Sequence, residues 1–271
     1  MRKLIAVTAF AAVLCATQAG AGVQKHVVHH YADPMKIVKK ENDNYWRNAR
    51  ETVYQTVPNL LATRKSELER GLAHAKLMHG DVEKKQIALT FDDGPHPSYT
   101  PKILEILRRY HVKATFFLVG ELAEKYPRLV KAELGGGHCV GNHTYHHVNL
   151  TQIPSVYVAA EIKACGAVLN NIIGRPPHLF RPPGGDYNDQ VARVAEALGY
   201  NIVLWTDDPA DYANPGEKLI EQRTLDKIDN GGIILIHDGI QQTINILPKL
   251  LQELKDKGCE FVTVDQMLRN R

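Results

Sequence analysis

One apolar run of this 271-residue chain ends directly in a pair of carboxylates: Gln86-Ile87-Ala88-Leu89-Thr90-Phe91-Asp92-Asp93-Gly94-Pro95. A short apolar run that is bounded by turn residues is typical of a buried strand. The Gly-Pro turn stops the strand just after the two acids, which lets both carboxylates face the same end of a sheet. We therefore expect a buried strand that delivers Asp92 and Asp93 to its carboxyl-terminal end.

Short apolar runs alternate with longer amphipathic segments through the rest of the chain. The runs predict strands at 86–90, 114–119, 139–142, 178–181, 200–205, 232–237 and 260–264. The segments between them predict helices at 101–110, 123–134, 155–173, 189–198, 218–227 and 243–257. Such alternation favours a parallel α/β domain, closed as a barrel or open as a sheet, which we place at 83–271. Seven strands would make it an incomplete version of the eight-stranded (β/α) barrel.

The first 21 residues have the composition of a removable signal peptide. Arg2 and Lys3 precede an apolar run that is too short to span a bilayer, and small residues follow it. We expect an exported protein, periplasmic or secreted, without stable membrane insertion, since no later run reaches the length of a membrane helix. Loss of the signal peptide would lower the formal charge from +3 to +1. A nearly neutral protein has little attraction for nucleic acid, so we expect none as a partner.

Residues 22–82 differ in character from the α/β domain, because polar and charged residues surround sparse apolar positions. The apolar positions keep a helical period from Trp46 to Val57 and again from Leu61 to Leu72. We predict a helical N-terminal extension whose two helices lean on the main domain. Covering the bottom of the barrel and mediating association are both open as its task.

Four polar clusters stand where a predicted strand has just ended. In a parallel α/β domain, the loops after the carboxyl ends of the strands gather on one face, and ligands bind there. The clusters supply two carboxylates, two histidines four residues apart, a guanidinium, a glycine turn and a further histidine. This is the inventory of a metal-assisted amide or ester hydrolase. Its residues are Asp92, Asp93, His143, His147, Arg181, Gly184 and His237.

The candidate metal ligands are Asp93, His143 and His147. A carboxylate bound to a cation is locked in its ionised form, whereas one kept off the metal retains enough proton affinity to act as a base. We therefore assign Asp93 to the metal and Asp92 to the base. On one helical turn the two histidines would project from the same face. With Asp93 they form a set that suits Zn²⁺ best and would also accept Co²⁺, nickel or iron.

Two features leave this ligand set open. An extended conformation of the segment would place His143 on one face with Tyr145 instead of His147. His138 and His146 are also near in sequence and confuse the count. We favour the helical pair, because it needs no distortion of the backbone.

Arg181 precedes two prolines and two glycines. The rigid prolines can fix its guanidinium beside Asp92, where a bidentate contact would orient the base and lower its pKa. The glycine turn leaves the N–H of Gly184 accessible to a developing oxyanion.

His237 ends the most apolar strand of the chain, so its ring should lie at the mouth of the sheet. A histidine there can donate a proton to a leaving amine, provided that a carboxylate stabilises its charged form. Asp211, in the acidic loop 207–212, is the candidate partner. Asp238 is the rival, because it is next in sequence.

With these clusters in this order, the chain resembles the polysaccharide deacetylase family, carbohydrate esterase family four. The resemblance covers about Gln86 to Leu268, and its most specific segment is Thr90-Phe91-Asp92-Asp93-Gly94-Pro95-His96-Pro97. It implies a distorted seven-stranded (β/α) barrel and a zinc-type metal. It also implies a role for each residue: Asp92 as base, Asp93, His143 and His147 as metal ligands, Arg181 as positioner of the base, Gly184 as oxyanion donor, His237 as acid, Asp211 as its tuning carboxylate, and Leu235 in the pocket for the acetyl methyl group.

Two positions depart from the family pattern. Gly184 stands where many members carry an aromatic residue, and Tyr212 stands where many carry tryptophan. The backbone N–H survives the first change, but both changes alter the walls of the sugar groove. Trp205 could supply a stacking surface for the sugar, or it could equally belong to the core.

The sequence thus predicts a metal-dependent hydrolase that removes N-acetyl groups from a polysaccharide or oligosaccharide containing N-acetylglucosamine. Chitin oligomers, peptidoglycan and an exopolysaccharide are the candidate substrates. The same site could instead act on O-acetyl groups of a xylan-type polymer or on a small-molecule amide. A catalytically inactive glycan-binding protein is a third interpretation, although binding alone needs no proton-transfer residues.

Overall fold

The structure, a computed structural model, describes residues 53–270. The predicted signal peptide and most of the first predicted helix lie outside these residues. Where that helix enters the described part, at residues 53–56, the chain is not helical. Helix α3 (Val57–Glu69) begins only after Thr56, whose side chain accepts a hydrogen bond from the N–H of Asn59. A Pro in the first turn, at Pro58, suits this start, because its missing N–H has no intrahelical partner there.

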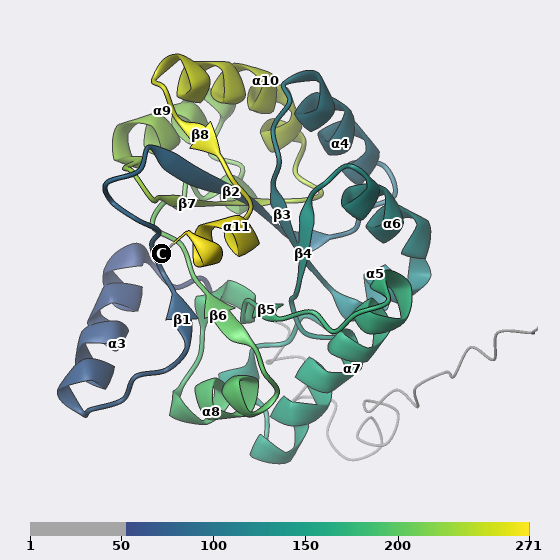
Figure 1. Cartoon of the computed structure of the whole chain (residues 1–271), viewed down its shortest axis with the longest axis vertical. Helices are drawn as coiled ribbons and strands as arrows, with labels where there is room; N and C mark the ends of the chain where they lie inside the picture. Colours follow the sequence, from purple (N-terminus) through teal and green to yellow (C-terminus); the bar gives the residue numbers. More distant parts are fainter. Residues whose placement is uncertain (1–52, 271) are drawn as a thin grey trace, which may run out of the picture. The chain divides into compact units, whose positions relative to one another are not determined.

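The strands form a distorted parallel barrel, as predicted (Figure 1). They pair in the order β1-β6-β5-β4-β3-β2-β7, with β8 added beside β2. A parallel bridge between Asp207 and Ile234 joins the chain just after β6 to β7 and closes the ring. The bounds are β1 (Lys76–Leu77), β2 (Gln86–Gly94), β3 (Thr115–Leu118), β4 (Cys139–Asn142), β5 (Leu179–Phe180), β6 (Asn201–Val203), β7 (Ile233–His237) and β8 (Glu260–Phe261).

All seven predicted strands are present, and β1 is an addition. Two residues are too short a run for any periodic signal, so the sequence could not reveal it. Because β1 pairs with β6 and lies before Glu83, the sheet begins inside the segment that we predicted to be a helical extension. We therefore propose that the catalytic unit starts before Glu83.

The helices surround the barrel and differ from the prediction at two places. The helix expected at 123–134 is divided, because Pro127 starts a new helix directly after Tyr126. A short helix near the C-terminus, α11, was not predicted. The bounds are α4 (Thr100–Arg109), α5 (Gly120–Lys125), α6 (Pro127–Gly135), α7 (Ser155–Ile173), α8 (Asp189–Ala197), α9 (Glu217–Lys227), α10 (Gln241–Asp256) and α11 (Val264–Arg269).

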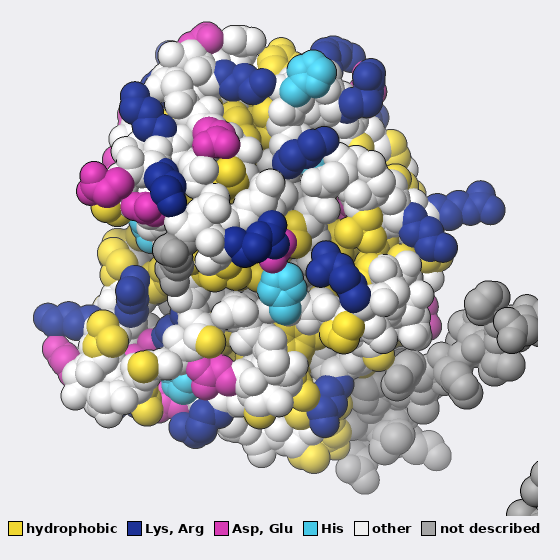
Figure 2. Space-filling view, in the orientation of Figure 1, with side chains coloured by type: hydrophobic (Ala, Val, Ile, Leu, Met, Phe, Trp, Pro, Cys, Tyr) yellow, Lys and Arg dark blue, Asp and Glu magenta, His cyan; other side chains and the backbone are white. Residues whose placement is uncertain are grey.

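Helix α11 covers the amino-terminal end of the barrel. The N–H of Val264 donates to Oγ1 of Thr115, the first residue of β3, at 2.9 Å. Figure 1 shows α11 at the centre of the ring of strands. On the surface seen from this side, Lys and Arg side chains are spread out rather than gathered in one patch (Figure 2). Among residues 53–270, the bottom of the barrel is therefore covered by α11, whereas α3 lies beside the barrel (Figure 1).

By length and composition alone, helix α7 is long and apolar enough to cross a membrane. This corrects our expectation that no run after the signal peptide reaches the length of a membrane helix. Its apolar character has another cause in this fold. Ile162, Cys165 and Leu169 are fully buried, because the helix packs against β4 and the neighbouring helices α5 and α6. The buried face of α7 is apolar because it belongs to the core.

Candidate active site

Asp92 lies near the carboxyl end of β2 and points into the barrel. Leu89 and Phe91 pack on the outer side of the strand, in one cluster with residues of α4 and α10. Side chains alternate along a strand, so Thr90 and Asp92 face inwards. There Asp92 is buried and stands in register with His237 of the neighbouring strand β7.

Arg181 is completely buried and holds the Asp92 carboxylate. Its Nη1 donates to Oδ1 of Asp92 and to Oγ1 of Thr90, both at 2.7 Å. Nε and Nη2 donate to the backbone carbonyls of residues 203–204, at 3.1 and 3.4 Å. The guanidinium also lies 4.1 Å from the ring centroid of Phe117. A buried cation needs such partners, and together they fix the orientation of the carboxylate that faces it.

Asp93 leaves the regular alternation of the strand. Its φ of +70° lies in the left-handed region, which few residues other than glycine adopt. Its Oδ1 lies 3.4 Å from Nε2 of His143 and 3.0 Å from Nε2 of His147. Burial favours the neutral acid, but the two imidazoles outweigh burial and hold the pKa of Asp93 well below its usual range.

These three side chains could hold a metal ion. Their donor atoms all lie within 4.8 Å of one another. Oδ1 of Asp93 is buried and has no hydrogen-bond partner of good geometry among the described residues. Two imidazole nitrogens and one carboxylate oxygen, with further coordination positions left open, suit Zn²⁺ and related transition metals. The residues present therefore fit the ion that the sequence predicts.

The two histidines converge, but not on the helical turn that we predicted. The segment after β4 is a bend, with a left-handed φ of +65° at residue 144 and of +53° at residue 147. The Asn142 side chain accepts the N–H of residue 144, and the Glu161 carboxylate accepts the N–H groups of residues 145 and 146. These side-chain acceptors, one nearby and one on α7, replace intrahelical hydrogen bonds. The bend brings the ring centroids of His143 and His147 to 5.0 Å.

The neighbouring histidines do not join the set. Nδ1 of His146 lies 2.7 Å from Oε1 of Glu161. Nδ1 of His138 accepts the N–H of Ala114, and burial lowers the pKa of His138 to about 4. In contrast, Nδ1 of His143 lies 2.7 Å from the carbonyl oxygen of residue 181, so it donates its proton there. This contact leaves Nε2 of His143 as the lone-pair nitrogen that a metal requires.

His237 is paired with Asp211, as predicted, and not with Asp238. Its Nδ1 lies 2.7 Å from Oδ1 of Asp211, and its backbone N–H donates to Oδ2 at 2.8 Å. Oγ1 of Thr243 donates to the same Oδ2. Burial alone would lower the pKa of His237, but the Asp211 carboxylate raises it to about 9. Asp238 instead accepts a hydrogen bond from Oγ1 of Thr100.

Three of the four predicted substrate contacts lie beside these groups. Gly184 has a φ of +62° in the short turn η2 (Pro183–Gly185), three residues after the buried guanidinium. Leu235 precedes His237 by two positions in β7, so both face the same side of the strand. The ring of Tyr212, in the turn η3 (Asp211–Ala213), stands edge-on to His237 with a centroid distance of 5.3 Å.

Trp205 is the exception among the predicted contacts. Its side chain is 1% exposed and belongs to the core of the barrel. It fills the space beside Gly185, where an added Cβ would meet the indole at 2.5 Å. A buried ring offers no face to a sugar, so the core alternative is correct for Trp205.

Tyr54 belongs to the mouth of the barrel, although we did not predict it from the sequence. Its ring stacks on that of Tyr212, with a centroid distance of 3.6 Å and an interplanar angle of 9°. It also stands edge-on to His237, at 5.5 Å. No local pattern marks this residue, because it reaches the mouth only through the packing of the segment that precedes the barrel.

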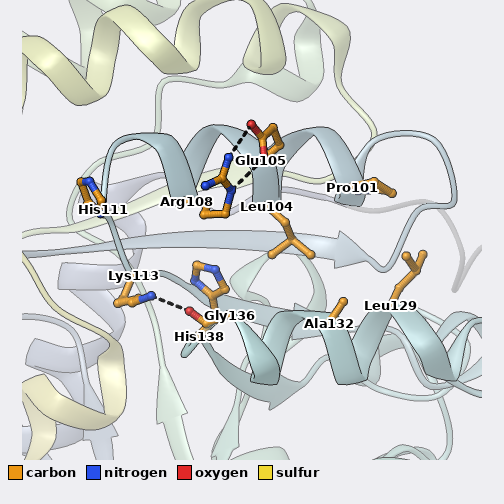
Figure 3. A pocket seen from close by; sticks show the side chains of 10 residues that line it. All are labelled: Pro101, Leu104, Glu105, Arg108, His111, Lys113, Leu129, Ala132, Gly136 and His138. Carbon is orange, nitrogen blue, oxygen red and sulfur yellow. Dashed lines mark hydrogen bonds and ion pairs between the residues drawn. The ribbon is translucent and has the colours of Figure 1, made fainter.

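A hollow of about 520 Å³ lies elsewhere, between α4 and α6 (Figure 3). Its charged groups are already engaged, since Arg108 pairs with Glu105 and Nζ of Lys113 donates to the carbonyl oxygen of Gly136. None of the predicted site residues lines it. We assign it no role in the chemistry.

Comparison with known proteins identifies the family. The family profile described as polysaccharide deacetylase matches residues 79–203. Over 191 residues the chain is 42% identical to a peptidoglycan-N-acetylglucosamine deacetylase of Bacillus cereus, a match that covers 69% of this chain and 89% of that protein. The chain belongs to the polysaccharide deacetylase family. The family that the motifs predicted is thus confirmed, and the chain is an enzyme of this class.

The chain is also similar to two further deacetylases. A chitooligosaccharide deacetylase of Azorhizobium caulinodans is 39% identical over 157 residues, which cover 58% of this chain and 75% of that protein. The crystal structure of a peptidoglycan N-acetylglucosamine deacetylase, bound to an N-hydroxybenzamide, matches with a TM-score of 0.70 at 36% identity. That match covers 74% of this chain and 95% of the other. It confirms the predicted distorted seven-stranded barrel.

Proposed function

We propose that this deacetylase removes the N-acetyl group from N-acetylglucosamine residues of a glycan outside the cytoplasm, with peptidoglycan as the leading substrate and chitin oligomers next. One observation carries the proposal: two buried pairs lie beside the three possible metal ligands at one mouth of the barrel. The pairs are Asp92–Arg181 and His237–Asp211, and the ligands are Asp93, His143 and His147. The names of the relatives support the choice of substrates. Peptidoglycan lies outside the cytoplasmic membrane, which agrees with the export that the first 21 residues predict.

In the proposed reaction, each group at the mouth of the barrel has its own role. A Zn²⁺ or Co²⁺ ion held by Asp93, His143 and His147 would polarise the acetamide carbonyl and make water more acidic. Asp92, oriented by Arg181, takes the proton of the attacking water.

Two further groups act on the tetrahedral intermediate. The N–H of Gly184 donates a hydrogen bond to the oxyanion. His237 carries a proton at neutral pH because Asp211 raises its pKa to about 9. It donates that proton to the departing amine, so the products are acetate and a free amine on the sugar.

Acetate release from a panel of glycans tests the proposed function. Purified enzyme with added Zn²⁺ is incubated with peptidoglycan, chitin oligomers and acetylated xylan, and the products are read by mass spectrometry. We expect acetate and free amines from at least one of the first two. Acetate from xylan alone would show an O-acetyl esterase, and binding of a glycan without release would show an inactive binding protein.

The metal assignment is tested by changing one histidine at a time. His147→Ala should weaken zinc binding by more than about 100-fold, because it removes a ligand and not just a supporting contact. His146→Gln is the matched control, since a glutamine keeps a hydrogen bond to Glu161 and leaves the cluster intact. Zinc content after dialysis is the measurement. Equal zinc content in both variants, or full activity of chelator-treated enzyme, contradicts the assignment.

A further inference from the structure

We propose that Tyr54 and Tyr212 together form an aromatic wall that binds the sugar ring whose acetyl group is removed. The inference rests on the proposed function and adds to it a specificity-determining residue. Both tyrosines lie outside residues 79–203, the part of the chain that matches the family profile, Tyr54 ahead of it and Tyr212 after it. Tyr54 belongs to the segment that precedes the barrel, so the wall joins two segments far apart in the chain.

The arrangement of three rings places this wall beside the catalytic acid. The rings of Tyr54 and Tyr212 are nearly parallel and in contact, whereas both are nearly perpendicular to His237, at 88° and 81°. His237 lies almost equally far from the two centroids, at 5.5 and 5.3 Å, so it borders the side of the stack. Burial and then the carboxylates of Asp93 and Asp92 raise the pKa of Tyr54, because all these groups share one mouth.

The segment that follows Tyr54 is fixed to the barrel. The backbone N–H of Gln55 donates to the carbonyl oxygen of Gly184 at 2.8 Å, and its side chain contacts Asp186. Immediately afterwards α3 begins, and its Leu60 is 1% exposed within the core of the barrel. Tyr54 is therefore held in place as part of the mouth.

The paired rings of Tyr54 and Tyr212 offer a surface that suits a sugar ring. A pyranose ring presents C–H groups on its faces and hydroxyl groups at its rim, so it packs on aromatic surfaces that carry polar edges. Tyrosine combines a flat apolar body with a hydroxyl group. Both tyrosines are half-buried, which leaves part of the pair accessible beside His237. Binding sites for small polar ligands are built in this way, from aromatic walls and a few oriented polar groups.

Two substrates separate sugar binding from the chemical step. Wild type, Tyr54→Ala and Tyr54→Phe are assayed on the glycan that the wild type deacetylates best and on 4-nitrophenyl acetate, which carries an acetyl group but no sugar. We expect Tyr54→Ala to raise KM for the glycan about tenfold, the loss expected for one aromatic contact. Its kcat/KM for the ester should stay within about twofold of wild type. Tyr54→Phe, which keeps the ring, should behave as wild type on both.

Three results would overturn the proposal. An unchanged glycan KM in Tyr54→Ala shows that the ring does not touch the sugar. An equal loss on both substrates shows that the ring supports the active site as a whole and not the sugar, and a gain on the glycan shows that its ring blocks the mouth.

A direct measurement of glycan binding separates the test of the aromatic wall from the test of the proposed function. Calorimetry compares binding of a chitin oligomer to Asp92→Asn and to Asp92→Asn/Tyr54→Ala, neither of which needs turnover. Weaker binding by the double variant, by about tenfold, supports the aromatic wall even if the wild type releases no acetate from any glycan. Equal binding overturns the wall, whether or not the deacetylase function holds.

Discussion

The two ends of the barrel are built in opposite ways. At the carboxyl end, Asp93, Thr144, His147 and Ala210 have left-handed φ values, and charged side chains are buried in pairs. At the amino end, α11 begins with a capping box, in which Thr263 and Gln266 satisfy each other's backbone N–H groups. Strained backbone and buried charge lower stability, and they persist where the surrounding structure holds them in place.

One end of the barrel thus serves stability and the other serves the chemistry. The amino end, which α11 covers, contributes ordinary packing and capping. The carboxyl end holds catalytic groups in strained conformations, at a cost in stability that the rest of the fold can bear. Variants at the mouth should therefore change activity most, whereas variants at α11 should change stability alone.

Asp92→Asn should give the largest effect at the mouth. The amide keeps the shape of the side chain and can still accept a hydrogen bond from Arg181, but it cannot take a proton from water. We expect kcat to fall about 10³-fold, within the range of general-base catalysis. Steady-state kinetics measure the loss, and circular dichroism and zinc content should remain those of the wild type. Retained turnover would remove Asp92 from the role of base.

Asp211→Asn should give a smaller effect with a distinct pH signature. The Asp211 carboxylate raises the pKa of His237 to about 9, so its loss should lower that pKa by about 1–3 units. The alkaline limb of the kcat/KM profile should move to lower pH by the same amount. Asp238→Asn is the control, because Asp238 contacts Thr100 and not the His237 ring. A limb that moves equally in both variants would contradict the assignment of Asp211.

The same pair sets a pH dependence of stability. The pKa of His237 is higher in the folded protein, at about 9, than its ordinary value of 6.5. Its contribution to stability is therefore complete below pH 6.5 and is lost as the pH rises through about 9. In Asp211→Asn this loss should disappear from the unfolding free energy measured against pH.

Thr263→Ala should give the smallest effect, and at the other end of the barrel. Loss of the cap should lower the free energy of unfolding by about 1 kcal/mol. Thr263→Ser keeps the hydroxyl group and serves as the control. Denaturant unfolding measures the change, and kcat should be unaltered in both variants. A fall in kcat would show that the two ends are coupled, which contradicts the expectation that α11 affects stability alone.

Some of the site could be read from residues close together in the chain. The run from Gln86 to Asp93 predicted a strand that ends in two acids, and that strand is β2. Helix α7 has the bounds that its periodic pattern predicted. The pairing of His143 with His147 was predicted correctly, but the helical turn was not, because the hydrogen bonds that form the bend come from Asn142 and Glu161.

The order of strands and helices, the acids after β2 and the histidine spacing after β4 could be read from the residues alone, because hydrophobic period and turn residues act over a few positions. The folded barrel was needed to show that Asp211 and not Asp238 contacts the His237 ring, that Trp205 lies in the core, and that Tyr54 reaches the mouth. Each of these outcomes depends on contacts between segments far apart in the chain. Their geometry exists only after the barrel has closed.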